Sequence, residues 1–294
     1  MAGTFPRGRI CWHELLTTDP KAAIAFYKRV VGWGTQAYSK GSPYVMWTAQ
    51  GKPMGGVMAL AADAQRMGSP PAWVMYVAVP DVDESVSDAT ALGARTYVPP
   101  RDIPAIGRFA VLADPQGATF ALFSSATSVP GHDAPSKRGE FSWHDLATTD
   151  WRAAWSFYER LFGWVKTEAM EVGPIGTYQM FGRAGQTLGG MFTKPREMTG
   201  PSQWLCYALV SSADRAATAT KQHGGKVLSG PMEVPGGDRI VKCLDAQGAA
   251  FAAHSLERPA PRAKRRSAAD RARPKRARPK PVRRAKAKAR RPPR

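Results

Sequence analysis

Two short stretches of the sequence place a tryptophan, a histidine and a carboxylate next to one another. Residues 12–14 read Trp-His-Glu, and residues 143–145 read Trp-His-Asp. A carboxylate beside an indole in a half-buried cleft can act as a base or as a hydrogen-bond partner, because burial raises its pKa. Histidines can instead bind a metal ion through their imidazole nitrogens. Which chemistry applies depends on which of these side chains share a face.

Side chains alternate between the two faces of a β-strand, and this separates the histidines from their neighbours. The alternation predicts a cleft-facing set and a set on the opposite face: Trp12, Glu14, Trp143 and Asp145 in the first, His13 and His144 in the second. We interpret the two carboxylates as catalytic candidates. We expect the two histidines to be hydrogen-bonded beneath a helix, or to be metal ligands if the register slips by one residue.

A third catalytic candidate is His254, near the end of the chain's last predicted strand. It keeps the parity of the cleft face, and the equivalent residue in an internal repeat is Phe123. Chemistry at His254 would therefore be confined to one of two clefts; the alternative is a solvated histidine. Small-ligand pockets are mostly apolar with a few polar anchors, and the remaining predicted ligand-binding residues are aromatic: Trp47, Tyr76, Tyr178 and Tyr207. Core packing explains these aromatic residues equally well.

These residues recur because the chain contains an internal repeat with an offset of 131 residues. Residues 8–33 and 139–164 align without a gap and are identical at 14 of 26 positions. Self-similarity of this kind fixes the domain count. We predict the following organisation: a domain at 8–125, a linker rich in Ser, Pro and Gly at 126–138, a second domain at 139–257, and a tail at 258–294.

Each repeat is predicted to be an α+β domain built from two βαβββ modules. In the first helix, Asp19 suits the N-cap, Pro20 the first helical position and Gly32 the stop. Asp150 and Gly163 occupy the equivalent positions of the second repeat. Apolar residues at helical spacing follow each cap, and short strand-like runs follow each helix.

This element order, with the motifs W-x-E/D-L-x-T-x-D-x-x-A-A-x-x-F-Y-x-x-x-x-G-W and D-P/A-Q-G-A-x-F, resembles the vicinal oxygen chelate (VOC) superfamily. That superfamily contains the glyoxalase, bleomycin-resistance and extradiol-dioxygenase proteins. The resemblance covers residues 8–254. It implies that paired modules wrap a cleft for a small molecule, often beside a divalent metal. It also implies that two tandem domains form a pseudo-dimer within one monomer, with a homodimer as the alternative.

The resemblance further implies where the family's metal ligands would stand in this chain. The equivalent positions hold side chains without imidazole or carboxylate: Trp12, Val74, Ala121, Trp143, Leu205 and Ala252, with Ala59 and Thr193 as less certain positions. We therefore predict no cofactor and a cleft that binds a small organic molecule, as in the bleomycin-resistance branch. The alternative is a metal-dependent lyase or dioxygenase with an unaligned ligand set: His13, His144, Glu14 and Asp145.

The net charge of +19 is concentrated in the tail. Residues 258–294 hold 18 Lys or Arg and one acid, whereas the rest of the chain holds 24 Lys or Arg against 22 acids. Too few apolar residues are present in the tail to offset the entropy of ordering, so we expect disorder and salt-sensitive, non-specific binding to nucleic acid. Anionic membrane surfaces and acidic proteins are the rival partners. A further hypothesis is a nucleic-acid-associated protein that the tail anchors.

Other features of the composition indicate the cellular environment in which the protein works. No apolar run approaches the length of a membrane span. The three cysteines are odd in number and widely spaced, which indicates buried, reduced thiols and not a disulfide framework. We expect a cytoplasmic protein, with association to the nucleoid if the tail binds DNA.

Overall fold

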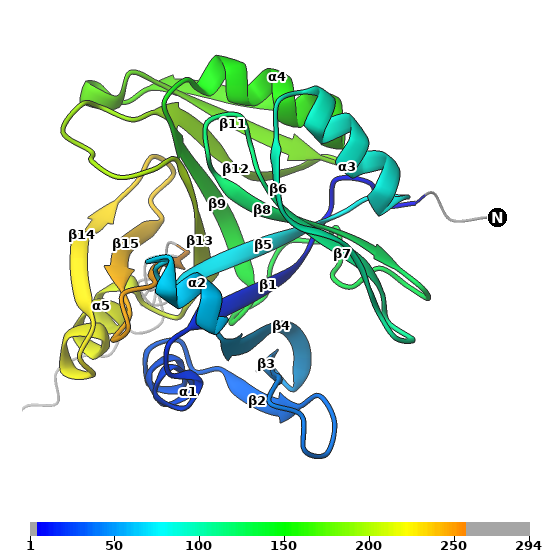
Figure 1. Ribbon diagram of the computed structural model, residues 1–294. Helices are drawn as coiled ribbons and strands as arrows, with labels where there is room; N and C mark the ends of the chain where they lie inside the picture. Colours follow the sequence, from blue (N-terminus) through cyan, green and yellow to red (C-terminus); the bar gives the residue numbers. More distant parts are fainter. Residues whose placement is uncertain (1–4, 257–294) are drawn as a thin grey trace, which may run out of the picture. The chain divides into compact units, whose positions relative to one another are not determined.

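The computed structural model describes residues 5–256, which form two eight-stranded mixed sheets with helices packed against them (Figure 1). The strand order is β2-β3-β4-β1-β5-β8-β7-β6 in the first sheet and β10-β11-β12-β9-β13-β16-β15-β14 in the second. The two orders are equivalent, so the predicted α+β class and the tandem VOC-type repeat are confirmed. The predicted tail lies outside the described residues.

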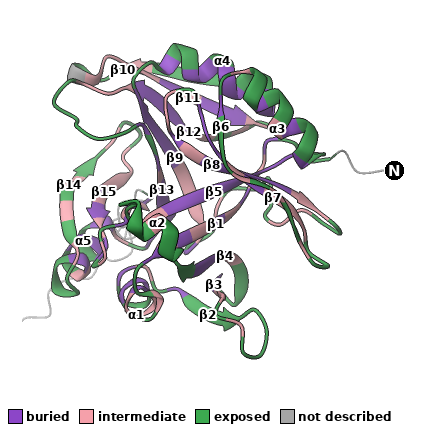
Figure 2. Cartoon of the chain, in the orientation of Figure 1, coloured by how far each residue is buried: buried purple, intermediate pink, exposed green. Residues whose placement is uncertain are grey.

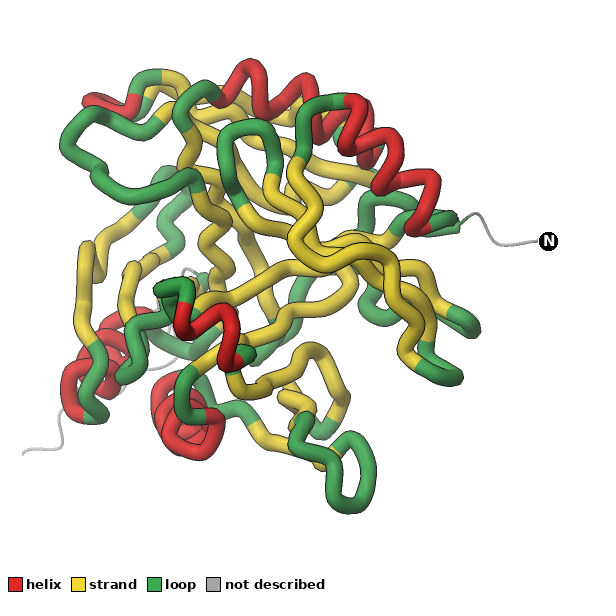
Figure 3. The backbone as a smooth tube through the Cα atoms, viewed as in Figure 1, coloured by secondary structure: helices red, strands yellow, loops and turns green. Residues whose placement is uncertain are grey.

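Each repeat supplies all the strands of one sheet. The first repeat contains β1 (Ile10–Thr17), α1 (Pro20–Val30), β2 (Gly34–Ala37), β3 (Val45–Ala49), β4 (Lys52–Ala59), α2 (Ala62–Arg66), β5 (Ala72–Ala78), α3 (Val82–Ala91), β6 (Arg95–Ile103), β7 (Gly107–Ala113) and β8 (Thr119–Ser125). The second contains β9 (Phe141–Thr148), α4 (Trp151–Phe162), β10 (Val165–Glu171), the 3-10 turn η1 (Gly173–Ile175), β11 (Thr177–Arg183), β12 (Gln186–Thr193), β13 (Gln203–Leu209), α5 (Ala213–Gln222), β14 (Lys226–Glu233), β15 (Arg239–Leu244) and β16 (Ala250–Ser255). Figure 3 shows the helices outside the strands.

The helix caps follow the sequence signals. The Asp19 side chain accepts a hydrogen bond from the Ala22 amide at the start of α1, and Asp150 caps α4 in the same way. Gly163 adopts the left-handed conformation, with φ of +68°, where α4 ends. Both predicted helices therefore begin at the expected residues, and α4 ends at Gly163 as expected, whereas α1 is C-capped by Val31, one residue before Gly32.

The two sheets share one large core, and the helices pack across the repeat boundary. Helix α1 contacts α5, and α3 contacts α4, so each module helix packs against a helix of the other repeat (Figure 1). The central strands are the most buried part of both sheets (Figure 2). The Phe-Tyr motif joins the repeats, because Tyr27 donates to Asp245 at 3.1 Å and Tyr158 donates to Asp114 at 2.9 Å. These motif residues therefore serve the junction between repeats.

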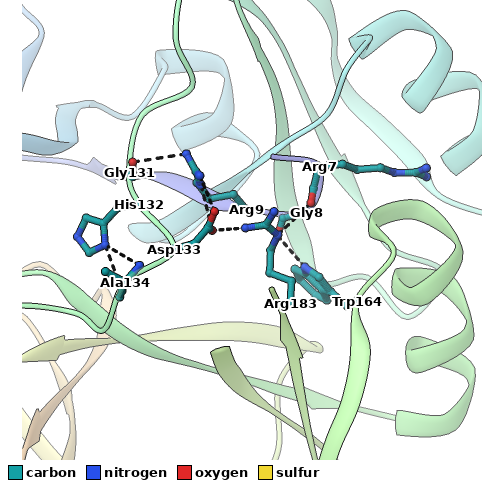
Figure 4. A network of polar contacts seen from close by, with 9 residues as sticks. All are labelled: Arg7, Gly8, Arg9, Gly131, His132, Asp133, Ala134, Trp164 and Arg183. Atoms are coloured by element: carbon teal, nitrogen blue, oxygen red, sulfur yellow. Dashed lines mark hydrogen bonds and ion pairs between the residues drawn. The ribbon is translucent and has the colours of Figure 1, made fainter. Parts of the chain in front are cut away.

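The linker is fixed to both repeats by one carboxylate. Asp133 forms ion pairs with Arg9, which precedes β1, and with Arg183 at the end of β11 (Figure 4). Nearby, Trp164 of the second repeat donates from Nε1 to the Gly8 carbonyl at 2.7 Å. Arg9 and Arg183 hold the pKa of Asp133 below its usual range.

Two simpler expectations were also tested. All three cysteines are buried and free of disulfides, as predicted: Cys11, Cys206 and Cys243. Within residues 5–256, no helix is long and apolar enough to cross a membrane.

Candidate ligand-binding site

A cavity of about 570 Å³ opens on the face of the first sheet that points away from the shared core. Trp12 and Glu14 from β1 and Tyr76 from β5 line it, together with Tyr38, Ser42 and Tyr44 of the loop after β2. Its other walls are apolar: Met46, Pro53, Met58, Ile103, Ile106, Phe109, Phe123 and Pro130. Because every lining residue lies within 12–130, the cavity belongs to the first repeat and to the linker that follows it.

Polar groups of the cavity converge on Glu14. Tyr76 donates its hydroxyl to Glu14 Oε2 at 2.9 Å, and Tyr44 also bonds to this carboxylate. Trp12 donates from Nε1 to the Tyr44 hydroxyl at 2.9 Å. Burial raises the pKa of Glu14, and the two tyrosine hydrogen bonds only partly oppose this rise. No cation is among the lining residues, so the carboxyl group is an uncompensated anchor in an apolar cavity.

Tyr44 is a site residue that strand alternation did not reveal, because it lies in a loop just before β3. The signal was the glycine pair of β4: a Cβ at Gly56 would overlap the Tyr44 ring, and a Cβ at Gly190 would overlap the ring of its counterpart Tyr178. Trp47 was expected to line the cleft, and the structure contradicts this. Trp47 is fully buried in the core against Tyr27, on the face of β3 opposite Met46.

In the second repeat, the equivalent carboxylate has a cationic partner. Asp145 accepts hydrogen bonds from Tyr178 at 2.6 Å, from Trp143 Nε1 at 3.1 Å and from the Tyr207 hydroxyl. Lys242 forms an ion pair with Asp145 at 3.1 Å. The tryptophan and both tyrosines thus repeat the arrangement around Glu14, and the lysine is added.

His254 lies beside this network and has two polar partners. Its Nδ1 is 2.9 Å from Ser142 Oγ, and its Nε2 is 2.9 Å from Asp238 Oδ2. Sequence reasoning singled out His254 but missed both partners. Ser142 stands in β9 where the pairing with β13 shifts register, and Asp238 immediately precedes β15.

His13 and His144 form a buried pair at the junction between the repeats. Their Nε2 atoms are 2.7 Å apart, and His144 Nδ1 lies 3.1 Å from the Leu188 carbonyl. A carbonyl only accepts, so His144 carries its proton on Nδ1 and His13 donates to His144 Nε2. Burial lowers the pKa of His144 to about 4 and lowers that of His13 well below its usual value. Both imidazoles are therefore neutral at pH 7.

The residues present do not fit the metal centre usual in the VOC fold. The aligned positions Trp12, Val74 and Ala121 belong to an apolar cluster on the cavity side of the first sheet. The alternative ligand set is also wrong, because β1 and β9 turn the histidines into the core and the carboxylates Glu14 and Asp145 away from it.

A second group of possible metal ligands lies in the core. Within the described part of the chain, His13, His144 and Cys206 are the one group of three such residues whose donor atoms lie within 4.8 Å of one another. Two nitrogens on one tetrahedral zinc are roughly 3.3 Å apart. The two imidazoles are closer than that, at 2.7 Å, because they bond directly to each other.

Comparison with known proteins shows which families and folds this chain resembles. Residues 10–123 match the Glyoxalase-like domain family. CFP32 of Mycobacterium tuberculosis is 40% identical over 121 residues, which are 40% of this chain and only 45% of CFP32. The anthracycline biosynthesis protein DnrV of Streptomyces peucetius is 27% identical over 274 residues, covering 88% of this chain and 97% of DnrV. The Mn(II)-bound glyoxalase from Novosphingobium aromaticivorans has a similar structure, with a TM-score of 0.58 and 16% identity over 86% of this chain and 84% of that one.

Residues 10–123 are therefore similar to a glyoxalase-like domain, and both sheets have the strand order of the predicted VOC-type fold. At 16% identity, the likeness to the manganese enzyme shows the fold alone.

Proposed function

We propose that the first repeat binds a flat, largely apolar organic molecule that carries a hydrogen-bonding oxygen, without a metal ion in the cavity. The single observation that supports this is the cavity of about 570 Å³ with apolar walls and Glu14 as its uncompensated polar anchor. Aromatic walls favour a flat aromatic ligand, and the Glu14 carboxyl group offers a hydrogen-bond partner for an oxygen substituent of that ligand. The relationship to DnrV, a protein of anthracycline biosynthesis, supports a polycyclic aromatic ketone as the ligand class.

A cavity-filling pair of variants tests this proposal. Met46 lines the cavity, and the residue at the equivalent strand position of the second repeat is Met180. We expect a hydroxylated anthraquinone to quench tryptophan fluorescence saturably in the wild type and in Met180→Trp. Met46→Trp is expected to weaken binding at least tenfold, since the larger side chain occupies the cavity. Equal affinity in both variants would place the ligand elsewhere.

Metal analysis provides the second test of the same proposal. Purified protein is expected to contain no stoichiometric Zn, Ni, Fe or Mn in the cavity, because the aligned ligand positions are apolar. One equivalent of metal that is lost in Glu14→Gln, but retained in Cys206→Ala, would contradict metal-free binding. The reverse pattern would locate the metal at the buried histidine pair.

We also propose that residues 258–294 bind nucleic acid without sequence preference. The supporting observation is their charge, 18 Lys or Arg against one acid. The binding of full-length protein to duplex DNA is expected to fall steeply between 50 mM and 200 mM salt, as counterion release requires. Deletion of 258–294 is expected to abolish it; retained binding would reject this role.

A further inference from the structure

The face of the second sheet that holds Asp145 and Lys242 also carries a serine, a histidine and an aspartate joined in sequence by hydrogen bonds. Ser142 Oγ and His254 Nδ1 are 2.9 Å apart, as are His254 Nε2 and Asp238 Oδ2. The His254 and Asp238 side chains are 12% and 30% exposed, and Ser142 is half-buried. The three groups are thus ordered by their contacts and still accessible to a small molecule.

The contacts determine where the protons lie. An ionised carboxylate only accepts hydrogen bonds, so Asp238 selects the tautomer of His254 that carries its proton on Nε2. Nδ1 then has a free lone pair and accepts the hydroxyl proton of Ser142. That proton has a second acceptor, the Tyr207 carbonyl, at the longer distance of 3.4 Å. The order hydroxyl, imidazole, carboxylate is that of a Ser-His-Asp triad, with the two ring nitrogens exchanged.

A bulge in β9 gives Ser142 this position. Strict alternation would turn Ser142 toward the core with His144, but the pairing with β13 shifts register between Tyr207 and Ala208. The same shift occurs in β1 beside Cys11, and Cys11 packs on the cavity side of the first sheet. The two bulges therefore place a serine and a cysteine at equivalent positions on the faces of the two sheets that point away from the shared core.

This hydrogen-bonded relay of Ser142, His254 and Asp238 occurs in the second repeat alone. The residues at the positions of Ser142, His254 and Asp238 in the first repeat are Cys11, Phe123 and Gly107. Lys242 lies on the same face as His254, because it pairs with Ala252 while Ile240 pairs with His254. Its ammonium group forms the ion pair with Asp145 and therefore adds no uncompensated charge to this face.

We propose that the second repeat is an acyl-transfer site for small carboxylic esters or thioesters, in which Ser142 is the nucleophile, His254 the general base and Asp238 the group that positions the imidazole. Ser142 Oγ bonds to the carbonyl carbon as its proton moves to His254 Nδ1. The bond from that carbon to the leaving alcohol or thiol then breaks, and the leaving atom takes the proton from Nδ1.

Water completes the cycle with the same groups. It attacks the acyl-serine and passes a proton to Nδ1, and the Ser142 oxygen leaves and recovers that proton. Ester and water give acid and alcohol, with no change in oxidation state. The site is separate from the cavity of the first repeat, so it does not depend on the ligand proposed there.

A fluorophosphonate probe tests the nucleophile on the full-length protein. The serine oxygen displaces fluoride from phosphorus, and peptide mapping by mass spectrometry locates the adduct. We expect one adduct, on Ser142, that is absent in Ser142→Ala. His254→Phe introduces the residue of the first repeat and is expected to slow labelling about 100-fold or more, since the general base is lost. p-Nitrophenyl acetate hydrolysis is expected to fall in parallel.

Two further variants separate chemistry from folding. Cys11→Ser places a serine on the first repeat's bulge opposite Phe123, where no base is present, and it is expected to gain no label. Asp238→Asn is expected to slow labelling, because an amide can also donate to the imidazole and no longer fixes its tautomer. Asp238→Glu restores a carboxylate and is expected to recover part of the rate, whereas a merely structural aspartate would give no such recovery.

An unchanged circular dichroism spectrum and an unchanged urea-unfolding midpoint show that each variant is folded. Absence of an adduct on Ser142 in the folded wild type would overturn the proposal. Labelling of Ser142 at the wild-type rate in folded His254→Phe would overturn it equally.

Discussion

At the positions where the first repeat has Val111, Phe123 and Gly107, the second repeat has Lys242, His254 and Asp238. These exchanges turn an apolar cavity with one uncompensated carboxyl group into a face that carries an ion pair and a hydrogen-bonded relay. Meanwhile the contacts that join the repeats are matched on both sides.

The matched contacts lie on the core side of the sheets. Each repeat's motif tyrosine donates to the turn aspartate of the other repeat, and each closing tryptophan donates to a backbone carbonyl of the other. Changing one of these residues would leave a buried polar atom in the other repeat without its partner. The opposite faces of the two sheets do not carry these matched contacts between the repeats, so their residues can differ while the scaffold stays the same.

The largest expected effect concerns the histidine pair that both repeats share. Folded-state pKa values of His13 and His144 are lowered by burial, to about 4 for His144, whereas an unfolded histidine titrates near 6.5. Below pH 6.5 the unfolded chain binds more protons, so the free energy of unfolding falls until the folded His144 is protonated. We expect His144 alone to contribute a loss of about 3 kcal/mol over this window.

Urea unfolding at several pH values between 7.5 and 4.5 measures this loss. The stability difference between wild type and His144→Asn is expected to shrink as the pH falls. The exposed His223→Asn serves as the matched control and should follow the wild type. Parallel curves for all three proteins would show that the pair does not control acid stability.

The next effect tests whether the scaffold is equally shared. Tyr27→Phe and Tyr158→Phe each remove a hydroxyl that bonds to a buried aspartate and accepts from a buried tryptophan, Trp73 or Trp204. We expect each variant to lose about 2 kcal/mol of unfolding free energy, because two buried polar groups lose a partner. Thermal or urea unfolding measures both. A difference of more than about 1 kcal/mol between them would break the equivalence of the two junctions.

A smaller pair of effects should have opposite signs in the two repeats. The raised pKa of Glu14 means that its contribution to stability is lost as the pH rises through the folded-state pKa. Glu14→Gln is therefore expected to be more stable than the wild type at pH 8, because it removes the ionisation of a buried group. Asp145→Asn removes the partner of Lys242 and is expected to lose about 1–2 kcal/mol. Stability changes of the same sign would show that the lysine does not distinguish the two sites.

The sequence predicted the elements and most faces, because helix caps and strand alternation are local signals. Asp19 and Asp150 cap their helices, and Trp12 and Glu14 share the cavity face as alternation required. Alternation failed for Ser142, since a bulge adds a residue to one strand and is set by the pairing with its neighbour.

The two hydrogen-bond partners of His254 could not be predicted from local sequence patterns, because they lie far from it in the sequence. Asp238 lies 16 residues from His254 and 96 from Ser142, and only the order of the strands brings them together. Trp47 and Met46 are both apolar, so composition alone did not decide which of them faces the core.

The smallest expected effect concerns the linker, which belongs to neither repeat and yet forms part of the wall of the first repeat's cavity. Pro130 lines the cavity, and three residues later Asp133 is held by Arg9 and Arg183. Asp133→Asn removes both ion pairs but keeps the shape of the side chain. Partly exposed ion pairs contribute little, so we expect less than about 1 kcal/mol of lost stability and a ligand that dissociates about threefold faster.

Stopped-flow displacement of the bound anthraquinone measures the dissociation rate. Because the pKa of Asp133 is lowered, its ion pairs with Arg9 and Arg183 persist at the pH where carboxyl groups ordinarily titrate. They are lost only when the pH falls through this lowered pKa. Raised salt should therefore mimic Asp133→Asn at pH 7, while a shift from pH 8 to pH 6 should not. Asp102→Asn, which breaks an exposed ion pair to Arg108 outside the linker, is the matched control. If it accelerates dissociation as much as Asp133→Asn, the linker is not what retains the ligand, and the difference between the two repeats lies wholly in the residues of their sheets.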